Sequence, residues 1–360
     1  MQLPAMIEEY QQRIRDAAAR NRPVCIRGGG TKDFYGQSLI GDILDTRSLS
    51  GIVSYEPTEL VITARAGTPL AEIEAVLAQE GQMLPFEPPH FGDGATLGGC
   101  VAAGLSGPRR ARAGAVRDYL LGVKLIDGRG ELQSFGGQVM KNVAGYDVSR
   151  LMAGSLGTLA LLVEISLKVL PIPPAERTLR FEMPEERALE ALNRWAAQPL
   201  PISASAYTEG DLGLRLSGAT AAVEAACRKL GGEQVEPAQA LRFWRGIREQ
   251  TDAFFQNVGM LWRLSVPSVA APVALPGKQL IEWDGSLRWL GTNAEADRVR
   301  ASAVEAGGHA TLFRGGDSQA RRIVAVFQPL PEAMMDLHRR LKHAFDPQGI
   351  LNPGRMFLEW

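Results

Sequence analysis

The sequence predicts an α+β fold in two domains, and three observations carry this prediction. The chain has 360 residues and 45% hydrophobic content, which suits about two domains of ~150 residues each. Apolar residues recur with a period of two from Leu161 to Val169, which is typical of a strand, and Pro171 ends it. From Arg177 a β-α-β-β-α order follows, typical of a ferredoxin-like layer. We expect a larger domain (1–172), a smaller α+β domain (173–330) and a closing helix and tail (331–360).

The first elements follow from periodicity and from proline. Ile7, Tyr10 and Ile14 recur at helical spacing, so an amphipathic helix is expected to open the chain. Pro23 ends this helix, and apolar runs then predict strands at Val24–Arg27 and Leu60–Arg65.

A helix and a hairpin are predicted next. Thr68 suits an N-cap with Pro69 at the first helical position, and Gly81 stands where a C-terminal glycine belongs. Asp127-Gly128 lies between two apolar runs and predicts a hairpin of strands at Gly122–Ile126 and Glu131–Ser134.

The second domain is expected to hold one clear ferredoxin-like pass and a weaker second one. The clear pass has strands at Thr178–Phe181, Ser203–Tyr207 and Leu212–Leu216 and helices at Glu185–Ala197 and Ala221–Leu230. The second runs from Met260 through the hairpin signal Asp284-Gly285 to a helix at Glu295–Ala306. A last helix is predicted from Pro331 to Phe345.

Composition excludes several classes of protein. A net charge of -1 gives no basic field for nucleic acid. Cys25, Cys100 and Cys227 are far apart without metal-ligand spacing, so we expect buried thiols in a reducing compartment. The first residues resemble no signal peptide, and no apolar run could span a membrane. We expect a cytoplasmic protein that can associate with a membrane through its partners.

The common nucleotide and metal motifs are absent. Asp33 stands where the third residue of a Rossmann glycine fingerprint belongs, and Pro272 stands where a Walker A motif needs its first glycine. His338 and His343 are too far apart on a helix to share a metal, so no metal site is expected.

Two glycine-rich segments remain, and they suit a diphosphate. The first follows an apolar run and contains Gly28, Gly29 and Gly30; the second is Gly94–Gly99. Glycine reaches positive φ freely and lets an anion approach the backbone, so consecutive amides can surround one phosphate.

These segments and four later ones resemble, in order, the vanillyl-alcohol oxidase or PCMH-type flavoproteins. Pro23–Lys32 and Gly94–Gly99 are similar to the two pyrophosphate loops of that family. The further matching segments are Arg117–Gly122, Lys141–Asp147, Gly154–Leu159 and the closing segment Phe345–Arg355. The sequences of Lys141–Asp147 and Gly154–Leu159 are most similar to the corresponding segments of a subunit of the bacterial glycolate oxidases.

The resemblance implies an FAD site in the first domain. It places the diphosphate on Arg27, Gly28, Gly29, Gly30, Thr31 and Lys32, with Thr96, Leu97, Gly98 and Gly99 completing the site. It places Asn142, Tyr146 and Asp147 near the ribityl or isoalloxazine side, Gly157 near the rest of the cofactor, and the backbone of Ile165 against the adenine. No histidine or cysteine follows the first loop, so non-covalent FAD is expected.

The resemblance also implies partners: a larger flavoprotein subunit and an iron–sulfur subunit, acting on a 2-hydroxy acid such as glycolate or D-lactate. The histidine-rich metal and substrate segment of catalytic family members is missing here. Arg263 lies in a segment resembling the cap strand that faces the flavin and is the candidate catalytic cation; a solvent-exposed strand arginine is an equal alternative. Arg109, Arg110 and Arg112 form a basic cluster that suits either a solvated face or an anion contact.

Three readings of function stay open. The chain is a redox-active FAD subunit whose complex oxidises a 2-hydroxy acid, with the substrate site in the larger partner. Alternatively, it is a structural subunit that keeps the flavin fold, or a stand-alone PCMH-type reductase that uses NADPH.

Overall fold

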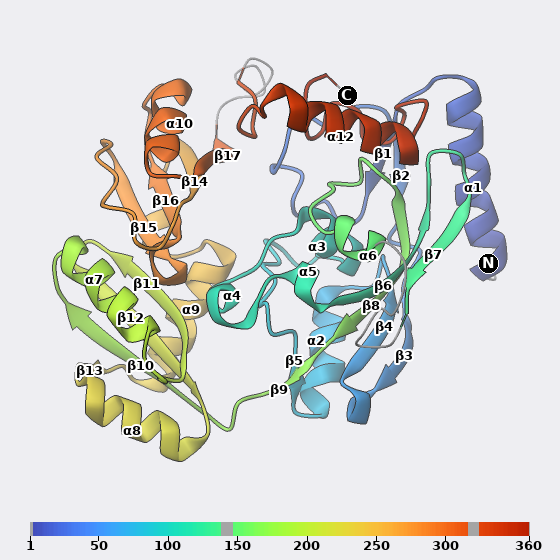
Figure 1. Cartoon of the computed structure of the whole chain (residues 1–360). Helices are drawn as coiled ribbons and strands as arrows, with labels where there is room; N and C mark the ends of the chain where they lie inside the picture. Colours follow the sequence, from blue (N-terminus) through green and yellow to red (C-terminus); the bar gives the residue numbers. More distant parts are fainter. Residues whose placement is uncertain (1–2, 138–146, 316–323, 360) are drawn as a thin grey trace.

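The computed structural model describes residues 3–137, 147–315 and 324–359, which form two lobes (Figure 1). One lobe is built on a five-stranded sheet and the other on an eight-stranded sheet. The last helix, α12 (Glu332–Phe345), lies with the first lobe, so both ends of the chain belong to it.

The first lobe has a central antiparallel sheet of order β3-β4-β8-β6-β7. Its strands are β3 (Ile52–Glu56), β4 (Val61–Arg65), β6 (Leu120–Ile126), β7 (Leu132–Gly136) and β8 (Leu161–Lys168). The predicted strand at Leu161 and the predicted hairpin at Asp127 are confirmed as β8 and β6–β7. Because β8 is paired on both sides and buried on both faces, it forms the middle of the lobe.

Helices cover this sheet on its two faces. Apolar side chains of α2 (Leu70–Gln79) and α3 (Leu97–Ala103) pack with one face in a single core. On the other side, α1 (Leu3–Ala19) buries Tyr10 and Ile14 with Leu161 and with the closing residues Ile350 and Leu351. The short helices α4 (Arg110–Ala113), α5 (Val116–Tyr119) and α6 (Val148–Leu151) connect these layers.

A small parallel pair carries the first glycine loop. β1 (Val24–Arg27) pairs with β2 (Asp42–Asp45), and the closing segment adds to β1 through the bridge between Val24 and Leu351. A second short pair, β5 (Gln82–Met83) with β9 (Leu170–Pro171), lies at the exit to the second lobe.

The start of α2 differs from the prediction. Pro69, not Thr68, occupies the N-cap position, and no side chain caps the helix. The hydroxyl of Thr68 instead accepts from the amide of Gly51 at 3.0 Å, because this loop needs the bond to hold the β2–β3 connection against the helix. Gly81 follows the helix at φ +64, as the C-terminal glycine prediction requires.

The second lobe has one continuous sheet of order β13-β10-β12-β11-β15-β16-β14-β17. Its strands are β10 (Ala175–Glu182), β11 (Ile202–Thr208), β12 (Asp211–Gly218), β13 (Glu233–Gln234), β14 (Met260–Ser265), β15 (Lys278–Glu282), β16 (Leu287–Gly291) and β17 (His309–Gly315). Each half has the strand order of a ferredoxin-like unit, and the halves join where β11 pairs with β15. Both predicted passes are therefore confirmed, joined edge to edge.

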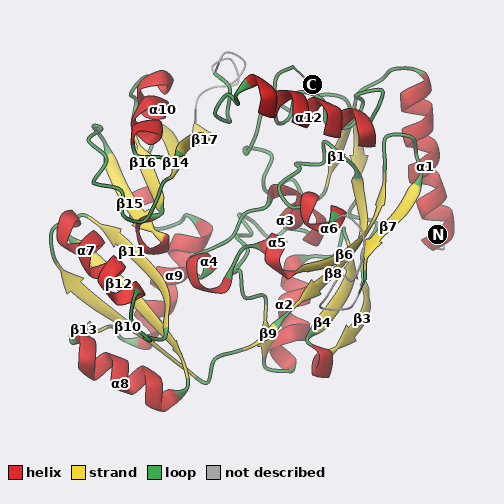
Figure 2. Cartoon of the chain, in the orientation of Figure 1, coloured by secondary structure: helices red, strands yellow, loops and turns green. Residues whose placement is uncertain are grey.

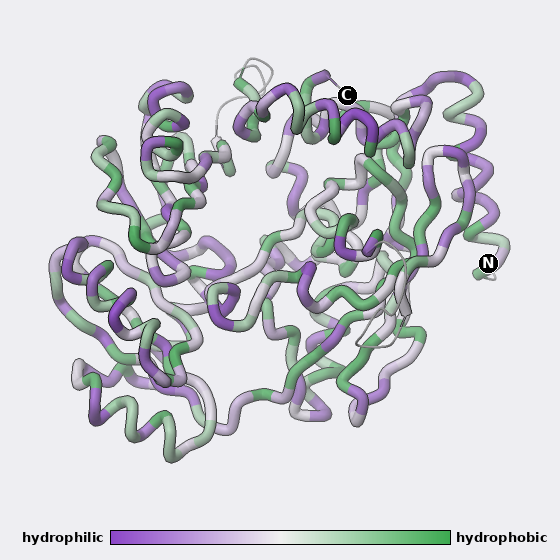
Figure 3. The backbone as a smooth tube through the Cα atoms, in the orientation of Figure 1, coloured by the Kyte–Doolittle hydropathy of each residue, from purple (hydrophilic) through white to green (hydrophobic). Residues whose placement is uncertain are grey.

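The helices described beside this sheet are α7 (Glu185–Ala196), α8 (Thr220–Leu230), α9 (Pro237–Glu249) and α10 (Ala296–Glu305). The second unit has a loop, not a helix, between β14 and β15 (Figure 2). Figure 3 shows the resulting pattern, with hydrophobic strands inside each lobe and hydrophilic stretches along the outer helices such as α12. The three cysteines are buried and unbonded, as predicted.

Buried ion pairs join the two lobes. Glu87 of the first lobe accepts from Arg215 of the second at 2.9 Å and from Arg109 at 3.2 Å. Burial alone would raise the pKa of Glu87, but these two guanidinium groups hold it below its ordinary value. Among the described residues, no helix is long and apolar enough to cross a membrane.

Candidate functional site

The first glycine loop leaves a row of backbone donors without protein acceptors. In the described part of the chain, the amides from Gly28 to Lys32 donate no hydrogen bond. Backbone amides are strong donors that folded proteins seldom leave unpaired away from water. A Cβ on Gly29 would lie 1.5 Å from the carbonyl oxygen of Gly94, and Gly30 has φ +74. Only glycine therefore lets this loop meet the second one.

The second loop shapes the other wall of the cradle, by which we mean the concavity between the loops at Gly28–Lys32 and Gly94–Gly99. Thr96 caps α3 by accepting from the amide of Gly99 at 3.2 Å, and a Cβ on Gly28 would lie 2.5 Å from the Thr96 hydroxyl. The cradle is lined by Thr96 and Gly99, and it continues past Gly98 in an adjoining cavity.

Two expected donors of the second loop are already used. The amide of Leu97 donates to Thr68 at 2.9 Å and that of Gly98 donates to Ala66 at 2.6 Å. The side chain of Leu97 is buried in the core of the first lobe. The second loop thus supplies shape to the cradle, and the free donors come from the first.

The cationic side chains of the first loop differ in their partners. Arg27 pairs with Asp33 at 2.7 Å, so its charge is balanced within the loop. Lys32 donates to the carbonyl of His90 at 3.2 Å but, among the described residues, has no carboxylate within 4 Å. Burial lowers the pKa of Lys32, as expected for an ammonium group without a counterion. Lys32 is therefore the cation available to an anionic ligand.

The closing segment completes the cradle, and sequence reasoning missed its two lining side chains. Asn352 accepts from the amide of Ile26 at 2.6 Å and donates to the carbonyl of Leu156 at 2.7 Å. Arg355 donates to the carbonyls of Lys32 at 3.2 Å and Asp33 at 3.1 Å, and also bonds Gln37. Both side chains line the cradle. The closing signature Phe345–Arg355 was the available signal, because it contains both residues.

A buried ion pair holds the closing segment in place. Lys342 on α12 donates to Asp346 at 2.7 Å and to the carbonyls of Thr158 and Leu351. Asp346 in turn accepts from the amides of Ile350 and Leu351. With every polar group partnered, the pair anchors the turn that leads to Asn352.

The structure brings some of the other predicted residues to the cradle and not others. Gly157 has φ +72 and lines the adjoining cavity, where a Cβ would lie 2.7 Å from the Asn352 side chain. Asn142 and Tyr146 lie outside the described residues. Asp147 is exposed, caps α6 and pairs with Arg150 at 3.0 Å, which gives it a structural role away from the cradle.

Ile165 requires a correction. Its side chain is fully buried in the middle of β8, and its backbone lies between Ala64 of β4 and Val123 of β6. A strand paired on both sides has no free backbone group to read an adenine ring. We therefore withdraw Ile165 from the candidate site.

Arg263 lines a second concavity, the interlobe pocket, which lies between the loop after α3 and the sheet of the second lobe. Its walls include Leu105 and Pro108 of the first lobe and Trp283, Trp289 and Phe313 of the second. The Arg263 guanidinium stacks 5.2 Å from the Trp283 ring centre. Arg263 is half-buried and faces this pocket, so the solvent-exposed alternative is wrong.

The three arginines of the predicted basic cluster, Arg109, Arg110 and Arg112, have different roles in the structure. Arg109 pairs with Glu87 and Glu176, and Arg112 pairs with Asp284 at 2.7 Å. These two arginines join the lobes. Arg110 stacks 4.5 Å from the Trp283 ring centre at an exposed position.

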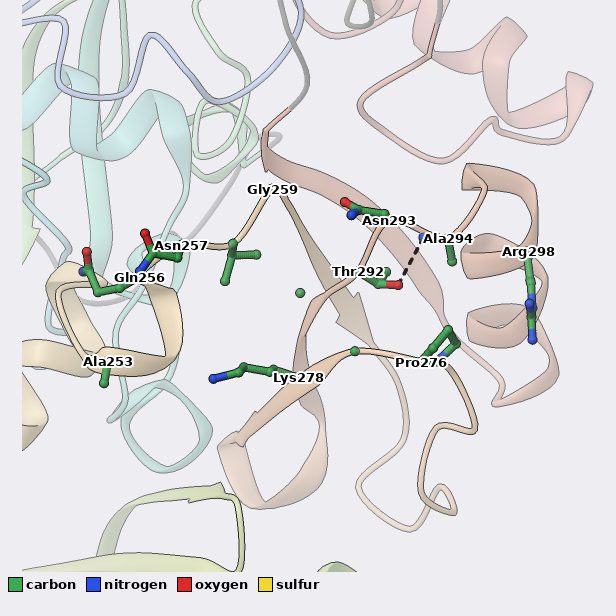
Figure 4. Close-up of a pocket in the computed structure, with 13 residues that line it drawn as sticks. Ala253, Gln256, Asn257, Gly259, Pro276, Lys278, Thr292, Asn293, Ala294 and Arg298 are labelled. Atoms are coloured by element: carbon green, nitrogen blue, oxygen red, sulfur yellow. Dashed lines mark hydrogen bonds between the residues drawn. The ribbon is translucent and has the colours of Figure 1, made fainter.

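A larger concavity than the cradle lies elsewhere, in the second lobe. It has a volume of about 890 Å³ and lies between the turn after α9 and the ends of β15 and β16 (Figure 4). Its charged side chains are Lys278 and Arg298, which lie on opposite sides (Figure 4). It shares no lining residue with the cradle or with the interlobe pocket.

Comparison with known proteins places this geometry in a family. Residues 2–136 match the FAD binding domain family, and residues 326–356 match the C-terminal domain of FAD linked oxidases. The chain is 50% identical to glycolate oxidase subunit GlcE of Escherichia coli (strain K12), over 99% of this chain and 97% of that protein. The chain belongs to the FAD-linked oxidases.

A more distant relative and a solved structure are also similar to this chain over most of its length. D-2-hydroxyglutarate dehydrogenase of Xanthomonas citri pv. viticola is 24% identical over 99% of this chain and 88% of that protein. The solved structure of an alkyldihydroxyacetonephosphate synthase has the same fold, with a TM-score of 0.64 and 16% identity over 96% of this chain and 74% of that one. The second lobe is thus the cap of a PCMH-type flavoprotein fold.

FAD is the cofactor of this family, and the cradle fits it. The row of free amides and the unpaired Lys32 ammonium both suit a diphosphate, and Cβ atoms on Gly28 or Gly29 would meet the second loop. No thiol is placed to react: burial raises the pKa of Cys100, the cysteine beside the cradle, to about 12. In this FAD-linked oxidoreductase, segments near both ends of the chain line the cradle.

Proposed function

We propose that this chain is the FAD-binding subunit of a multi-subunit 2-hydroxy-acid dehydrogenase that acts on glycolate or a similar acid such as D-lactate. Its role is to take part in electron transfer from the substrate to an iron–sulfur partner. The observation that carries the proposal is the cradle, where, within the described ranges, the amides from Gly28 to Lys32 donate no hydrogen bond and Lys32 has no carboxylate within 4 Å. The 50% identity to a glycolate oxidase subunit supports the choice of substrate.

The chain's own residues have distinct parts in this function. Amides of the first loop and the Lys32 ammonium hold the diphosphate, while Asn352 and Arg355 keep that loop in shape. Bound FAD supplies the two-electron oxidation chemistry that protein side chains lack. Leu105, Trp283 and Phe313 exclude water from the pocket in which Arg263 offers a positive charge.

We infer two partners from the subunit character of the relative: a larger flavoprotein subunit and an iron–sulfur subunit. The retained flavin cradle favours a redox role over a purely structural one, because a structural subunit needs neither a row of unbonded loop amides nor a half-buried lysine that has no carboxylate beside it among the described residues. Non-covalent attachment of FAD is part of the proposal, since no histidine or cysteine follows Lys32 in the loop.

Two measurements test this proposal. The purified full-length chain is expected to be yellow, to release its flavin on acid precipitation, and to show flavin reduction by glycolate when its partner subunits are added. A colourless chain that takes up no added FAD contradicts the redox role and leaves the structural alternative.

A further inference from the structure

We propose that Glu249, the last residue of the cap helix α9, is a positioning residue for the FAD diphosphate and acts through Lys32 of the cradle. The proposal rests on the FAD placement that is part of the function proposed above, and it gives the second lobe a part in cofactor binding. The contact is made by the bridging segment, by which we mean residues 87–93, which lead into the second glycine loop.

The bridging segment lies against the first glycine loop. A Cβ on Gly92 would lie 3.3 Å from the side chain of Thr31. Lys32 Nζ donates to the carbonyl of His90 at 3.2 Å and lies 5.7 Å from the centre of the Phe91 ring. A carbonyl oxygen and an aromatic face both attract an ammonium group. His90 and Phe91 together therefore determine where the charge of Lys32 lies.

The backbone of Phe91 adopts a conformation that needs support. Its φ of 55 lies in the left-handed region, which bulky residues rarely adopt and which persists only where the surroundings hold it. The ring is held by edge-on packing against Phe34 and Phe313, with ring centres 5.4 and 6.2 Å away. The polar backbone groups at this position need a partner of their own.

Glu249 is that partner. Its Oε2 atom accepts from the amide of His90 at 3.0 Å and from the amide of Phe91 at 2.9 Å. Its Oε1 atom accepts from Arg248 Nε at 2.7 Å, and the Glu249 side chain is only 14% exposed. Bonds from amides to a carboxylate are stronger than bonds between neutral groups, so this contact holds the bridging segment firmly to the cap.

A single peptide group connects Glu249 to Lys32. The carbonyl of His90 and the amide of Phe91 belong to the same peptide, and in a trans peptide the two point in opposite directions. The amide donates to Glu249 and the carbonyl accepts from Lys32. Glu249 therefore orients and polarises the group that holds the Lys32 ammonium.

The position of Glu249 in its helix supports a role outside the helix. Glu249 ends α9, where the helix dipole is negative and disfavours a carboxylate. The helix itself thus does not account for an acid at this position. The two amides of the bridging segment do, because they give the carboxylate two donors from the other lobe.

The charge of Glu249 also acts on Lys32. Burial lowers the pKa of Lys32, and Cys100 on α3 and Glu249 oppose this change. The Cys100 thiol has its own pKa raised to about 12, so it stays neutral at physiological pH and Glu249 supplies the negative charge. The other charged groups nearby are the Arg27–Asp33 pair, Glu74 with His90 at 3.2 Å and Arg248 at 3.9 Å, and Arg314 at 5.6 Å from the Phe91 ring centre.

Fluorescence titration of the full-length chain, stripped of flavin, with FAD between about pH 7.5 and 10 tests the role. Glu249→Ala is expected to raise the FAD dissociation constant about three- to thirtyfold, as for other coupled neighbours. Glu249→Gln keeps an oxygen acceptor for the two amides, so it retains most of the affinity near pH 7.5. Its affinity should fall at a lower pH than that of the wild type, because an amide does not stabilise the Lys32 ammonium.

A double variant distinguishes action through Lys32 from a general effect on the fold. Lys32→Met with Glu249→Ala is expected to bind FAD within about twofold of Lys32→Met alone, since the two residues act as one unit. Asp284→Asn is the control: it removes another ion pair between the lobes, with Arg112 at 2.7 Å, and its described contacts lie outside the bridging segment. It should leave the FAD affinity and its pH profile unchanged.

Three outcomes overturn the positioning role: wild-type FAD affinity in folded Glu249→Ala, a Glu249→Gln pH profile that matches the wild type, or losses that add in the double variant. Where Glu249→Ala does not fold, the Glu249→Gln profile decides, because a purely structural role would lower the unfolding temperature and leave the profile in place. A wild-type chain that takes up no FAD contradicts the proposed function as well. FAD binding that does not depend on Glu249 contradicts the positioning role alone.

Discussion

Arg355 and Lys32 are 323 positions apart, and the Arg355 guanidinium donates to the Lys32 carbonyl at 3.2 Å. The same group bonds the carbonyls of Asp33 and Gln37, so one side chain fixes the exit of the first glycine loop. Arg355 therefore holds the residues directly after the free amides of the loop. Segments near the two ends of the chain together form the cradle.

Arg355→Ala is expected to weaken both the fold of the loop and its hold on FAD. Arg355 is only 5% exposed, and its loss removes hydrogen bonds to three carbonyls, at a cost of about 3 kcal/mol of unfolding free energy. Thermal unfolding and flavin titration measure the two effects, with the exposed Arg187→Ala as control. Unchanged flavin affinity in a destabilised Arg355→Ala chain would show that the contact serves the fold alone.

Gly29→Val is expected to abolish FAD binding. The new Cβ would lie 1.5 Å from the Gly94 carbonyl oxygen, so the two loops must move apart and the cradle opens. Gly81→Ala is the control, because no atom lies within 4 Å of a Cβ at Gly81. Flavin absorbance of the purified proteins measures how much FAD each variant binds. Full FAD occupancy in Gly29→Val would refute our placement of the diphosphate.

Lys32→Met is expected to raise the FAD dissociation constant by about ten- to a hundredfold, because a charge-assisted bond is worth about 1.5–3 kcal/mol. Burial lowers the pKa of Lys32, so wild-type affinity is also expected to fall at a less alkaline pH than an exposed lysine would give. Fluorescence titration with FAD across pH measures both effects. Lys124→Met, which removes a lysine paired with Glu164 on β8, is the control and should bind FAD normally.

Glu282→Gln is expected to change how stability depends on pH. The pKa of this carboxyl group is raised from 4.5 to about 7 on folding, so between these pH values the folded chain binds more protons than the unfolded one. Wild-type stability therefore falls as pH rises through this window, by up to about 3 kcal/mol. The variant lacks this loss, because an amide does not titrate. Denaturant unfolding at a series of pH values gives the unfolding free energy of the wild type and of the variant. The two free energies should change differently with pH between about 4.5 and 7; the same pH dependence in both proteins would contradict the raised pKa of Glu282.

Local patterns predicted most of the fold. The period of two in β8 and the β-α-β-β-α order of the second lobe are local signals, and the structure confirms both. Thr68 shows the limit of such signals: its sequence context suits an N-cap, but a tertiary bond to Gly51 uses its hydroxyl. How the two ferredoxin-like units join could not be predicted, since the pairing of β11 with β15 involves strands far apart in sequence.

The candidate site could be predicted only in part, because some of its residues come together through long-range packing. Glycine runs mark a phosphate loop locally, so Gly28–Lys32 was found. Asn352 and Arg355 come to that loop only through the long-range packing of α12 and its buried Lys342–Asp346 pair. The family resemblance suggested a nucleotide contact at Ile165 that the central position of β8 excludes.

The closing segment also dictates when the protein can mature. A ribosome that has released only the first lobe and the cap has produced the glycine loops without Asn352 or Arg355 to shape them. Prosthetic-group loading is thus expected to follow synthesis of Asn352 and Arg355, and a chain cut short just before α12 would keep both lobes but leave the pigment site unfinished.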